Sequence, residues 1–155
     1  MAEWTSNAVQ TVNPGEAIIF TDNPVPCRRG FVTELDGTGL FNLQGYTPYR
    51  RACPCQGIPS AIYQVDFGAN IAIPTGETVG AISVAIALGG ATIPASTMTV
   101  TPAAVEEYFN VSCAINALVQ KGCCEPLMIR NTSTIPILVQ NANVIFARPD
   151  LAITR

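Results

Sequence analysis

The chain has 155 residues, enough for a single domain with a substantial core. Hydrophobic residues make up 48% of it and charged residues only 12%, whereas an average soluble domain carries roughly 25% charged residues. The net charge of −3 argues against a generic nucleic-acid binder and against docking on an anionic membrane, and the absence of His removes the commonest general base and metal ligand.

The N-terminal region, residues 1–12, is predicted to form an arm, followed by one domain at 13–149 and a C-terminal tail at 150–155. Trp4 is the only tryptophan, and it could anchor this arm onto a neighbouring subunit or surface; an untethered arm is the alternative. The start of the chain has no basic stretch followed by an apolar run, so we expect synthesis in the cytoplasm without a signal peptide.

Turn signals and β-rich segments alternate along the rest of the chain. Asn13-Pro14-Gly15 predicts a turn, and Asp36-Gly37 predicts a hairpin. The spread of 12 Pro and 12 Gly leaves few windows for a helix, although Pro102–Glu107 could start a short one with Thr101 as N-cap. The candidate strands are Ala8–Val12, Ala17–Phe20, Gly30–Leu35, Gly39–Leu43, Ala61–Ile73, Val79–Leu88, Thr92–Thr101, Glu107–Val119, Leu127–Arg130 and Ile135–Phe146. Such a series predicts an all-β sandwich or barrel.

The segment Val79–Leu88 is the most apolar of the chain, and it is too short to cross a bilayer, which needs roughly 20 residues. Small side chains at Ser83, Ala85 and Ala87 alternate with larger aliphatic ones, which suits close packing against a neighbouring layer or subunit. Because the chain has so few charges, we expect copies of itself to cover part of its surface.

Six cysteines are concentrated near turns and in an irregular segment at residues 45–60. They could form disulfides within or between subunits, remain free thiols, or bind zinc, although C-x-C and adjacent pairs do not match the spacing of zinc knuckles. The cysteines are Cys27, Cys53, Cys55, Cys113, Cys123 and Cys124.

Two basic pairs, Arg28-Arg29 and Arg50-Arg51, hold four of the eight basic residues. They are candidate partner contacts, able to clamp a carboxylate or phosphate or to meet acidic residues of a partner. The alternative is a solvated loop rim.

No residue pattern indicates catalysis or a bound cofactor. Glu106-Glu107 is the only adjacent acidic pair, and successive side chains of a strand point to opposite faces, so these carboxylates would diverge. A glycan site is hinted at only by Gln44, Tyr46 and Tyr49. We therefore predict a protein that is not an enzyme and that uses no cofactor or resident metal.

The run YQVDFGANIAIPTGETVGAISVAIALGGATIPASTMTVTPAA at Tyr63–Ala104 and the run RNTSTIPILVQNANVIFARP at Arg130–Pro149 resemble the globular heads of bacterial collagen-like and exosporium-type proteins. Those heads are similar to the trimeric jelly roll of complement-type and tumour-necrosis-factor-type domains, and similar chains occur among phage structural proteins of gut Firmicutes. No Gly-X-Y collagen stalk precedes the domain, which favours a free trimer or a particle-bound subunit over a tethered head.

The resemblance implies a jelly-roll β-sandwich that forms a homotrimer. Gln140, Asn141 and Asn143 lie on an otherwise apolar strand, where copies around a threefold axis would supply their hydrogen-bond partners. The function predicted is a structural subunit that decorates a phage capsid or virion surface; a spore-coat or cell-surface subunit and a glycan- or receptor-binding head are the alternatives. No membrane or specific nucleic-acid partner is expected, and the place of action is the virion or an extracellular or spore surface.

Overall fold

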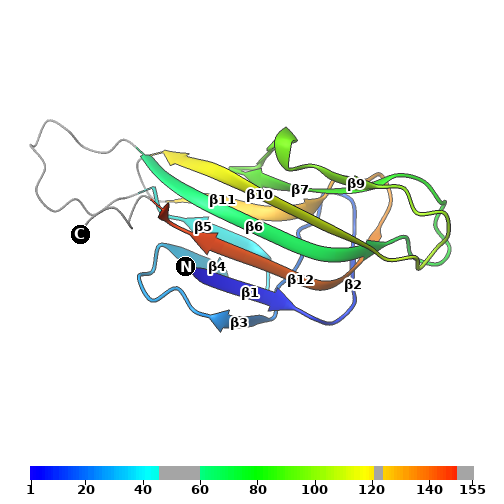
Figure 1. Ribbon diagram of the computed structural model, residues 1–155, viewed down its shortest axis with the longest axis horizontal. Helices are drawn as coiled ribbons and strands as arrows, with labels where there is room; N and C mark the ends of the chain where they lie inside the picture. Colours follow the sequence, from blue (N-terminus) through cyan, green and yellow to red (C-terminus); the bar gives the residue numbers. More distant parts are fainter. Residues whose placement is uncertain (46–59, 121–123, 150–155) are drawn as a thin grey trace, which may run out of the picture.

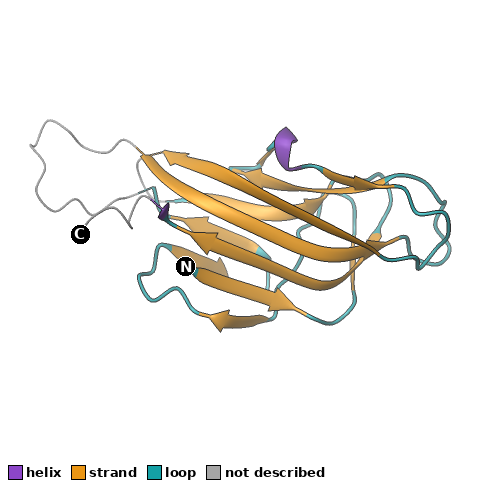
Figure 2. Cartoon of the chain, viewed as in Figure 1, coloured by secondary structure: helices purple, strands orange, loops and turns teal. Residues whose placement is uncertain are grey.

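The computed structural model describes residues 1–45, 60–120 and 124–149, which form two antiparallel sheets packed face to face (Figures 1 and 2). Sheet A contains β10 (Phe109–Gln120), β6 (Ser60–Ala72), β12 (Ile137–Ala147), β1 (Ala2–Ser6) and β3 (Asp22–Val25) in that order, with β2 (Gln10–Val12) also paired to β12. Sheet B contains β4 (Val32–Leu35), β5 (Leu40–Leu43), β11 (Glu125–Asn131), β7 (Ile82–Leu88) and β8 (Ala91–Thr92), with β9 (Met98–Val100) also paired to β7. The predicted all-β sandwich is confirmed.

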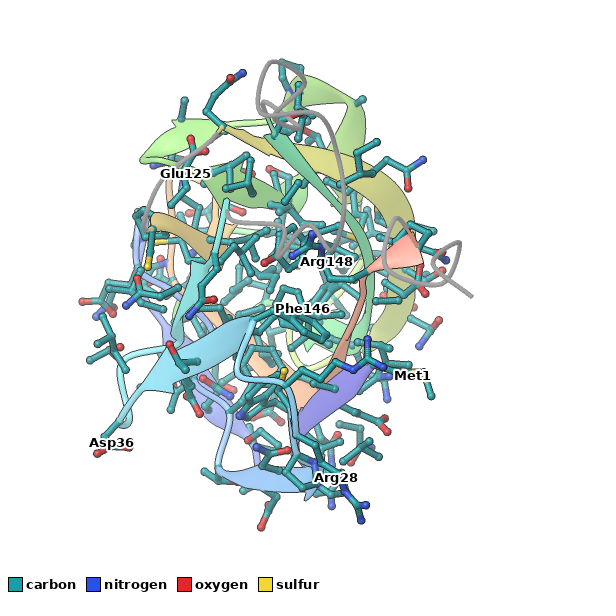
Figure 3. All side chains as sticks on the ribbon, turned by 90° about the vertical axis from the view of Figure 1, so that its left-hand side faces the viewer. Met1, Arg28, Asp36, Glu125, Phe146 and Arg148 are labelled. Atoms are coloured by element: carbon teal, nitrogen blue, oxygen red, sulfur yellow. The ribbon has the colours of Figure 1, made fainter. Side chains whose placement is uncertain are left out.

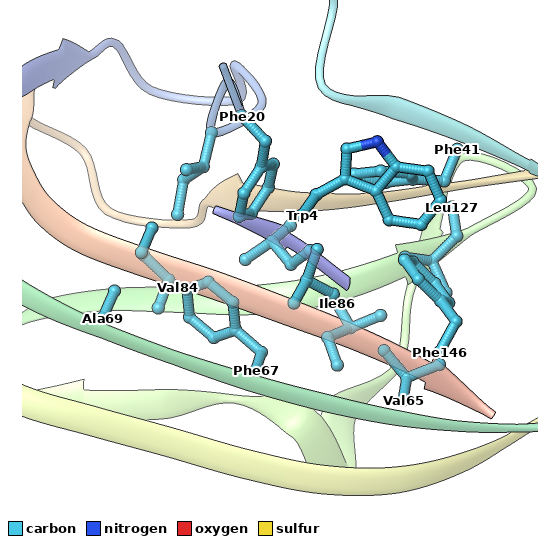
Figure 4. Packing of buried hydrophobic residues seen from close by; sticks show 14 of the residues in the cluster. Trp4, Phe20, Phe41, Val65, Phe67, Ala69, Val84, Ile86, Leu127 and Phe146 are labelled. Carbon is cyan, nitrogen blue, oxygen red and sulfur yellow. The ribbon is translucent and has the colours of Figure 1, made fainter. Parts of the chain in front are cut away.

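The core lies between the sheets because apolar side chains occupy alternate positions along the strands. In β6, Tyr63, Val65 and Phe67 are buried while the neighbouring Ile62 and Gln64 are exposed. Successive residues of a strand point to opposite faces, so this alternation assigns one face to the core and the other to the surface. Figure 4 shows Val65 and Phe67 of sheet A packing toward Val84, Ile86 and Leu127 of sheet B.

An aromatic cluster joins the two sheets near the N-terminus. The Trp4 ring contacts the edges of Phe41 and Phe146, with centroids 5.0 and 5.7 Å apart, and Phe20 packs on Phe41 at 5.6 Å (Figure 4). Trp4 is only 4% exposed. The prediction that it contacts a partner is therefore corrected, since β1 lies inside sheet A between β12 and β3 and aims Trp4 at the core. The predicted arm at residues 1–12 likewise contains two strands of this sheet.

The two predicted turns behave differently. Asp36-Gly37 closes a hairpin between β4 and β5, as expected. Asn13-Pro14-Gly15 forms a turn, but its flanks do not pair with each other: β2 joins sheet A, while Ala17 bridges to Arg130 in sheet B. The chain passes from one layer to the other at this turn, which local sequence signals do not reveal.

The segment predicted as one strand at Thr92–Thr101 is interrupted by a 3-10 turn at Pro94–Ser96. Pro94 has no backbone N–H for a ladder, and the buried Ser96 hydroxyl accepts from the Ile86 N–H at 2.9 Å in its place. The alternative helix at Pro102–Glu107 is not formed. Glu107 instead accepts from the Ala103 and Ala104 N–H groups at 2.9 and 3.2 Å, which closes a turn.

The small side chains of β7 are covered within the same chain. Ala85 and Ala87 lie on the outer side of sheet B and are fully buried. Arg130 and Met128 stand directly opposite them on β11, and the Arg130 guanidinium donates to the Thr92 hydroxyl. The arginine stem therefore lies over Ala85, and no neighbouring subunit is needed to explain the small residues.

Candidate functional site

The outer face of sheet A is uncharged over most of its area. The six strands of this sheet contain neither Lys nor Arg, and their only acids are Glu3, Asp22 and Asp66. On β6, β10 and β12 the residues that point away from the core are aliphatic, small or carboxamide-bearing apart from the acid Asp66: Ile62, Gln64, Asp66, Gly68, Asn70, Asn110, Ser112, Ala114, Asn116, Leu118, Leu138, Gln140, Asn143 and Ile145. We call these residues the A face.

Strand register places the carboxamides of the A face in adjacent positions. Asn110 lies opposite Asn70 and donates to its Oδ1 at 3.1 Å, and Gln140 lies opposite Asn70 on its other side. Asn116 lies opposite Gln64 in the same way. From the sequence only the β12 carboxamides stand out, because their partners on β6 and β10 are distant in sequence and only strand register brings them together.

The three predicted interface residues lie at an irregularity of β12. The register of β12 against β6 shifts between Gln140 and Asn143, and Asn141 is exposed with φ 52°. Asn tolerates the left-handed conformation better than most residues, so it suits a bulge. Asn143 fits over Gly68, where an added Cβ would lie 3.0 Å from the Asn143 Oδ1.

An exposed apolar pair occupies the β10 side of the A face. Ile62 and Leu118 stand directly opposite each other, with 42% and 51% of their surface exposed. They form a contiguous aliphatic patch on strands that contain neither lysine nor arginine. Such a patch is typical of association surfaces rather than of a solvated sheet.

The strand edges of the sandwich differ in how they are protected. β3 is four residues long and contains Pro24, β4 is four residues long and carries the inward-pointing Glu34, and β8 and β9 have two and three residues. These features discourage pairing with another chain. β10 is twelve residues long, without Pro or charge, and forms no ladder with any described strand except β6.

A second candidate site lies at the opposite edge of sheet A, where the first basic pair sits. The loop between β3 and β4 turns at Cys27–Gly30, with the Gly30 N–H donating to the Cys27 carbonyl at 3.1 Å. Arg28 and Arg29 are the central residues of this turn, and both are exposed. They line a pocket of about 260 Å³. Arg50 and Arg51, the other pair, lie outside the described residues.

A buried arginine lies near Phe31, one of the residues that line this pocket. Arg148 is 6% exposed, and its guanidinium carbon lies 4.8 Å from the Tyr63 ring centre and 5.9 Å from that of Phe31. The Tyr63 hydroxyl contacts the carbonyl oxygens of Phe31 and Gln44 at 2.9 and 2.7 Å. Figure 3 looks onto this end of the molecule, with Met1, Arg28 and Arg148 labelled. The burial of Arg148 could not be predicted from the sequence, because no neighbouring residue distinguishes it from a solvated arginine.

The cysteines fall into three groups. Cys27 and Cys113 carry free thiols, and burial together with the nearby Asp66 carboxylate raises the pKa of the Cys113 thiol. Cys124 is disulfide-bonded. Cys53, Cys55 and Cys123 lie outside the described residues, as do Tyr46 and Tyr49 of the suggested glycan site. Within residues 1–45, 60–120 and 124–149, no group of three or more potential metal ligands comes together.

Two further observations concern the described part of the chain. Burial and the neighbouring Asp36 carboxylate raise the pKa of Glu34, whose Oε1 has no hydrogen-bond partner there. No helix in the same ranges is long and apolar enough to span a membrane.

Comparison with solved structures defines the fold. A tumour-necrosis-factor domain, Eiger from S. frugiperda, superposes with a TM-score of 0.61 at 13% identity, over 95% of this chain and 90% of that one. The fold is a jelly roll of the tumour-necrosis-factor and C1q type. The globular domain of zebrafish complement 1qA aligns over 93% of this jelly roll and 94% of its own length, with a TM-score of 0.50 and 11% identity. No protein-family model matches the sequence, and neither does any curated protein.

Proposed function

We propose that this jelly roll is a non-enzymatic structural subunit that forms a homotrimer and decorates a larger assembly, a phage capsid or virion surface. The observation that carries the proposal is the β10 side of sheet A. A twelve-residue uncharged edge strand adjoins a face with no Lys or Arg, and it carries the exposed Ile62 and Leu118. A surface of this composition is poorly solvated, and burial against sister chains would remove it from water.

The carboxamides of the A face support burial by copies of the same chain. A face made only of aliphatic groups would associate without defined orientation, whereas buried amides need partners in fixed positions. Gln140 and Asn143 of the A face, with the exposed Asn141 at the bulge between them, supply both donors and acceptors, so identical side chains meeting near a symmetry axis can satisfy one another. The absence of His and of a converging acid pair supports a role without catalysis.

Decoration of a phage particle is supported by the resemblance of Tyr63–Ala104 and Arg130–Pro149 to a group of globular heads, because similar chains occur among phage structural proteins. The same segments resemble exosporium-type heads, so a spore-coat or cell-surface subunit is the second candidate. Both assignments use the trimer as a building block, and they differ only in the particle to which it attaches.

The trimer is tested by native mass spectrometry of the purified chain. We expect a species of three times the chain mass of 16.4 kDa. Leu118→Lys should raise the dissociation constant at least about tenfold, because burying an unpaired ammonium costs several kcal/mol. Leu35→Lys is the matched control, since Leu35 is 44% exposed but lies on the protected strand β4, and this variant should remain trimeric.

A wild-type chain that is monomeric at micromolar concentration would refute the proposed trimer. So would a Leu118→Lys variant that associates as well as the wild type. Measurement with and without reductant separates association through the A face from disulfide cross-linking, because only the latter disappears when thiols are reduced.

The site of decoration is tested by immunogold electron microscopy of lysates and spore preparations from the source organism. Label on phage particles supports the first candidate, and label on spores or cell envelopes supports the second. Label confined to soluble protein would contradict both.

A further inference from the structure

The pocket beside the β3–β4 loop combines positive charge with an apolar wall. It has a volume of about 260 Å³, slightly below the ≈ 300–1,000 Å³ of typical small-molecule sites. Its size suits a ligand no larger than an amino acid, a monosaccharide acid or a small aromatic acid. The lining residues are Met1, Val25, Pro26, Arg28, Arg29 and Phe31.

The backbone presents both arginines at this pocket. The hydrogen bond from Gly30 N–H to Cys27 carbonyl closes a four-residue turn, and Gly30 takes φ 67°, a conformation that strains other residues. Within the ranges that the structure describes, neither Arg28 nor Arg29 has a carboxylate partner. Two adjacent guanidinium groups without a counter-charge repel each other, and an anion bound between them relieves that repulsion.

The floor of the pocket is held by buried contacts. Phe31 is 6% exposed, and its carbonyl is held by the Tyr63 hydroxyl at 2.9 Å. The Arg148 guanidinium lies 5.9 Å from the centre of the Phe31 ring. The Phe31 wall of the pocket is therefore fixed from the core side, so that a ligand meets a preformed surface.

We propose that this pocket binds a small organic carboxylate through Arg28 and Arg29. The planar guanidinium matches a carboxylate bidentately, and the walls formed by Val25, Pro26 and Met1 accept the apolar body of the acid. The site lies beside β3, at the edge of sheet A opposite β10, so it does not depend on the proposed trimer. A free acid and an acidic side chain of a peptide share this chemistry.

The binding is tested by titrating the ¹⁵N-labelled full chain with benzoate and following amide chemical shifts. We expect saturable shifts at Val25–Phe31, and no comparable shifts with benzamide, which has the same shape without the charge. The Arg28→Ala/Arg29→Ala double variant should weaken benzoate binding at least about tenfold, since hydrogen bonds to charged groups contribute about 1.5–3 kcal/mol. Arg130→Ala, on sheet B, is the control and should bind as the wild type does.

Further variants and ligands show how the arginines bind the anion and whether it is a free acid or a peptide side chain. Arg28→Lys/Arg29→Lys keeps the positive charge but removes the planar guanidinium groups that bind a carboxylate bidentately. It should therefore bind benzoate more weakly than the wild type and more tightly than the double alanine variant. Val25→Ala should weaken benzoate but leave acetate unchanged. Tighter binding of N-acetylglutamate amide than of benzoate would identify a peptide side chain as the source, and the reverse a free acid.

Absence of saturable shifts with both acids would overturn the proposal. Equal affinity for benzoate in the wild type and the Arg28→Ala/Arg29→Ala variant would overturn it too, and so would equal binding of benzamide. Because both arginines are exposed, the variants are expected to keep the wild-type spectrum away from the loop, which verifies that the fold is intact.

Discussion

The outer surfaces of the two sheets differ in how their apolar residues are covered. On sheet B, Arg130 lies over Ala85 and bonds to Thr92, and the edge strand β4 is short and carries the inward-pointing Glu34. On sheet A, none of the six described strands carries a Lys or Arg, and the edge strand β10 runs for twelve residues without charge or Pro. A side chain of sheet B thus covers its own outer face, whereas on the β10 side of sheet A Ile62 and Leu118 are exposed.

This difference teaches that low charge content alone does not indicate an interface. Both sheets are poor in charge, yet small apolar residues on sheet B are buried by neighbours on the next strand. What distinguishes the β10 side of sheet A is the combination of exposed aliphatic residues, ordered carboxamides and a long edge strand without charge or Pro. Substitutions on sheet B should therefore alter folding stability, whereas substitutions on the A face should alter association.

The largest expected effect comes from the core that both surfaces share. Phe41→Ala removes a ring that packs on Trp4, Phe20 and Phe146, and it should lower the free energy of unfolding by about 3–5 kcal/mol. Urea denaturation measures the change. A loss below about 1 kcal/mol would show that the aromatic cluster does not hold the sheets together.

The next effect tests how the edge of sheet B is attached. A Cβ at Gly39 would lie 2.2 Å from the carbonyl oxygen of Ile18, and the residue has φ 68°. Gly39→Ala should lower the free energy of unfolding by about 2 kcal/mol or more. The new side chain is forced into a strained φ, and the backbone at Ile18 also has to move.

Gly37→Ala is the matched control in the same hairpin. Gly37 also has φ 68°, but nothing lies within 4 Å of its added Cβ, so only the conformational cost of about 1–2 kcal/mol applies. Thermal unfolding of the two variants measures the difference. An equal loss of stability in both variants would mean that the close contact with the Ile18 carbonyl adds nothing to the cost of Gly39→Ala.

A smaller effect concerns the cover of sheet B. Arg130→Ala exposes Ala85 and removes the hydrogen bond to Thr92. It should lower the free energy of unfolding by about 1 kcal/mol and leave association between chains unchanged. Arg130→Met keeps most of the apolar side chain over Ala85, so it should lose less folding stability than Arg130→Ala. Chemical denaturation and native mass together check both statements, and a loss of association in Arg130→Ala would contradict the contrast between the sheets.

The smallest effect concerns Glu34 on the edge strand β4. The pKa of Glu34 is raised by burial, so the folded chain holds its proton more tightly than the unfolded chain does. The resulting stabilisation is complete below the unfolded pKa and is lost as pH rises through the folded pKa. Glu34→Gln should raise the Tm at neutral pH by less than about 2 °C, an effect of at most about 0.5 kcal/mol for a domain of this size.

Calorimetry of Glu34→Gln at neutral and acidic pH checks this prediction. The advantage over the wild type should disappear when Glu34 is protonated in both states. A variant that is less stable than the wild type at neutral pH would contradict the account of a poorly solvated carboxylate.

Much of the fold could be predicted from local patterns. Alternation along Ala61–Ile73 and the turn at Asp36-Gly37 indicated strands and a hairpin that the structure contains, because side-chain period and turn chemistry act over a few residues. The candidate site was predicted only in part. Asn141 and Asn143 stand out in the sequence because they are polar residues on an apolar strand. Asn70 and Asn110 look like ordinary surface residues in the sequence, and only the strand register shows that they are paired.

Chain order and composition by themselves determined that this protein is a β-sandwich with few charges, since both depend on residue types and short periodicities. The tertiary structure decided that Trp4 is a core residue, that Ala85 is covered by Arg130, and that Arg28 and Arg29 flank a pocket above Phe31. Each of these contacts joins segments of different strands or loops. Their formation depends on which strands become neighbours, and that choice is made by the summed packing of the whole core rather than by any local signal.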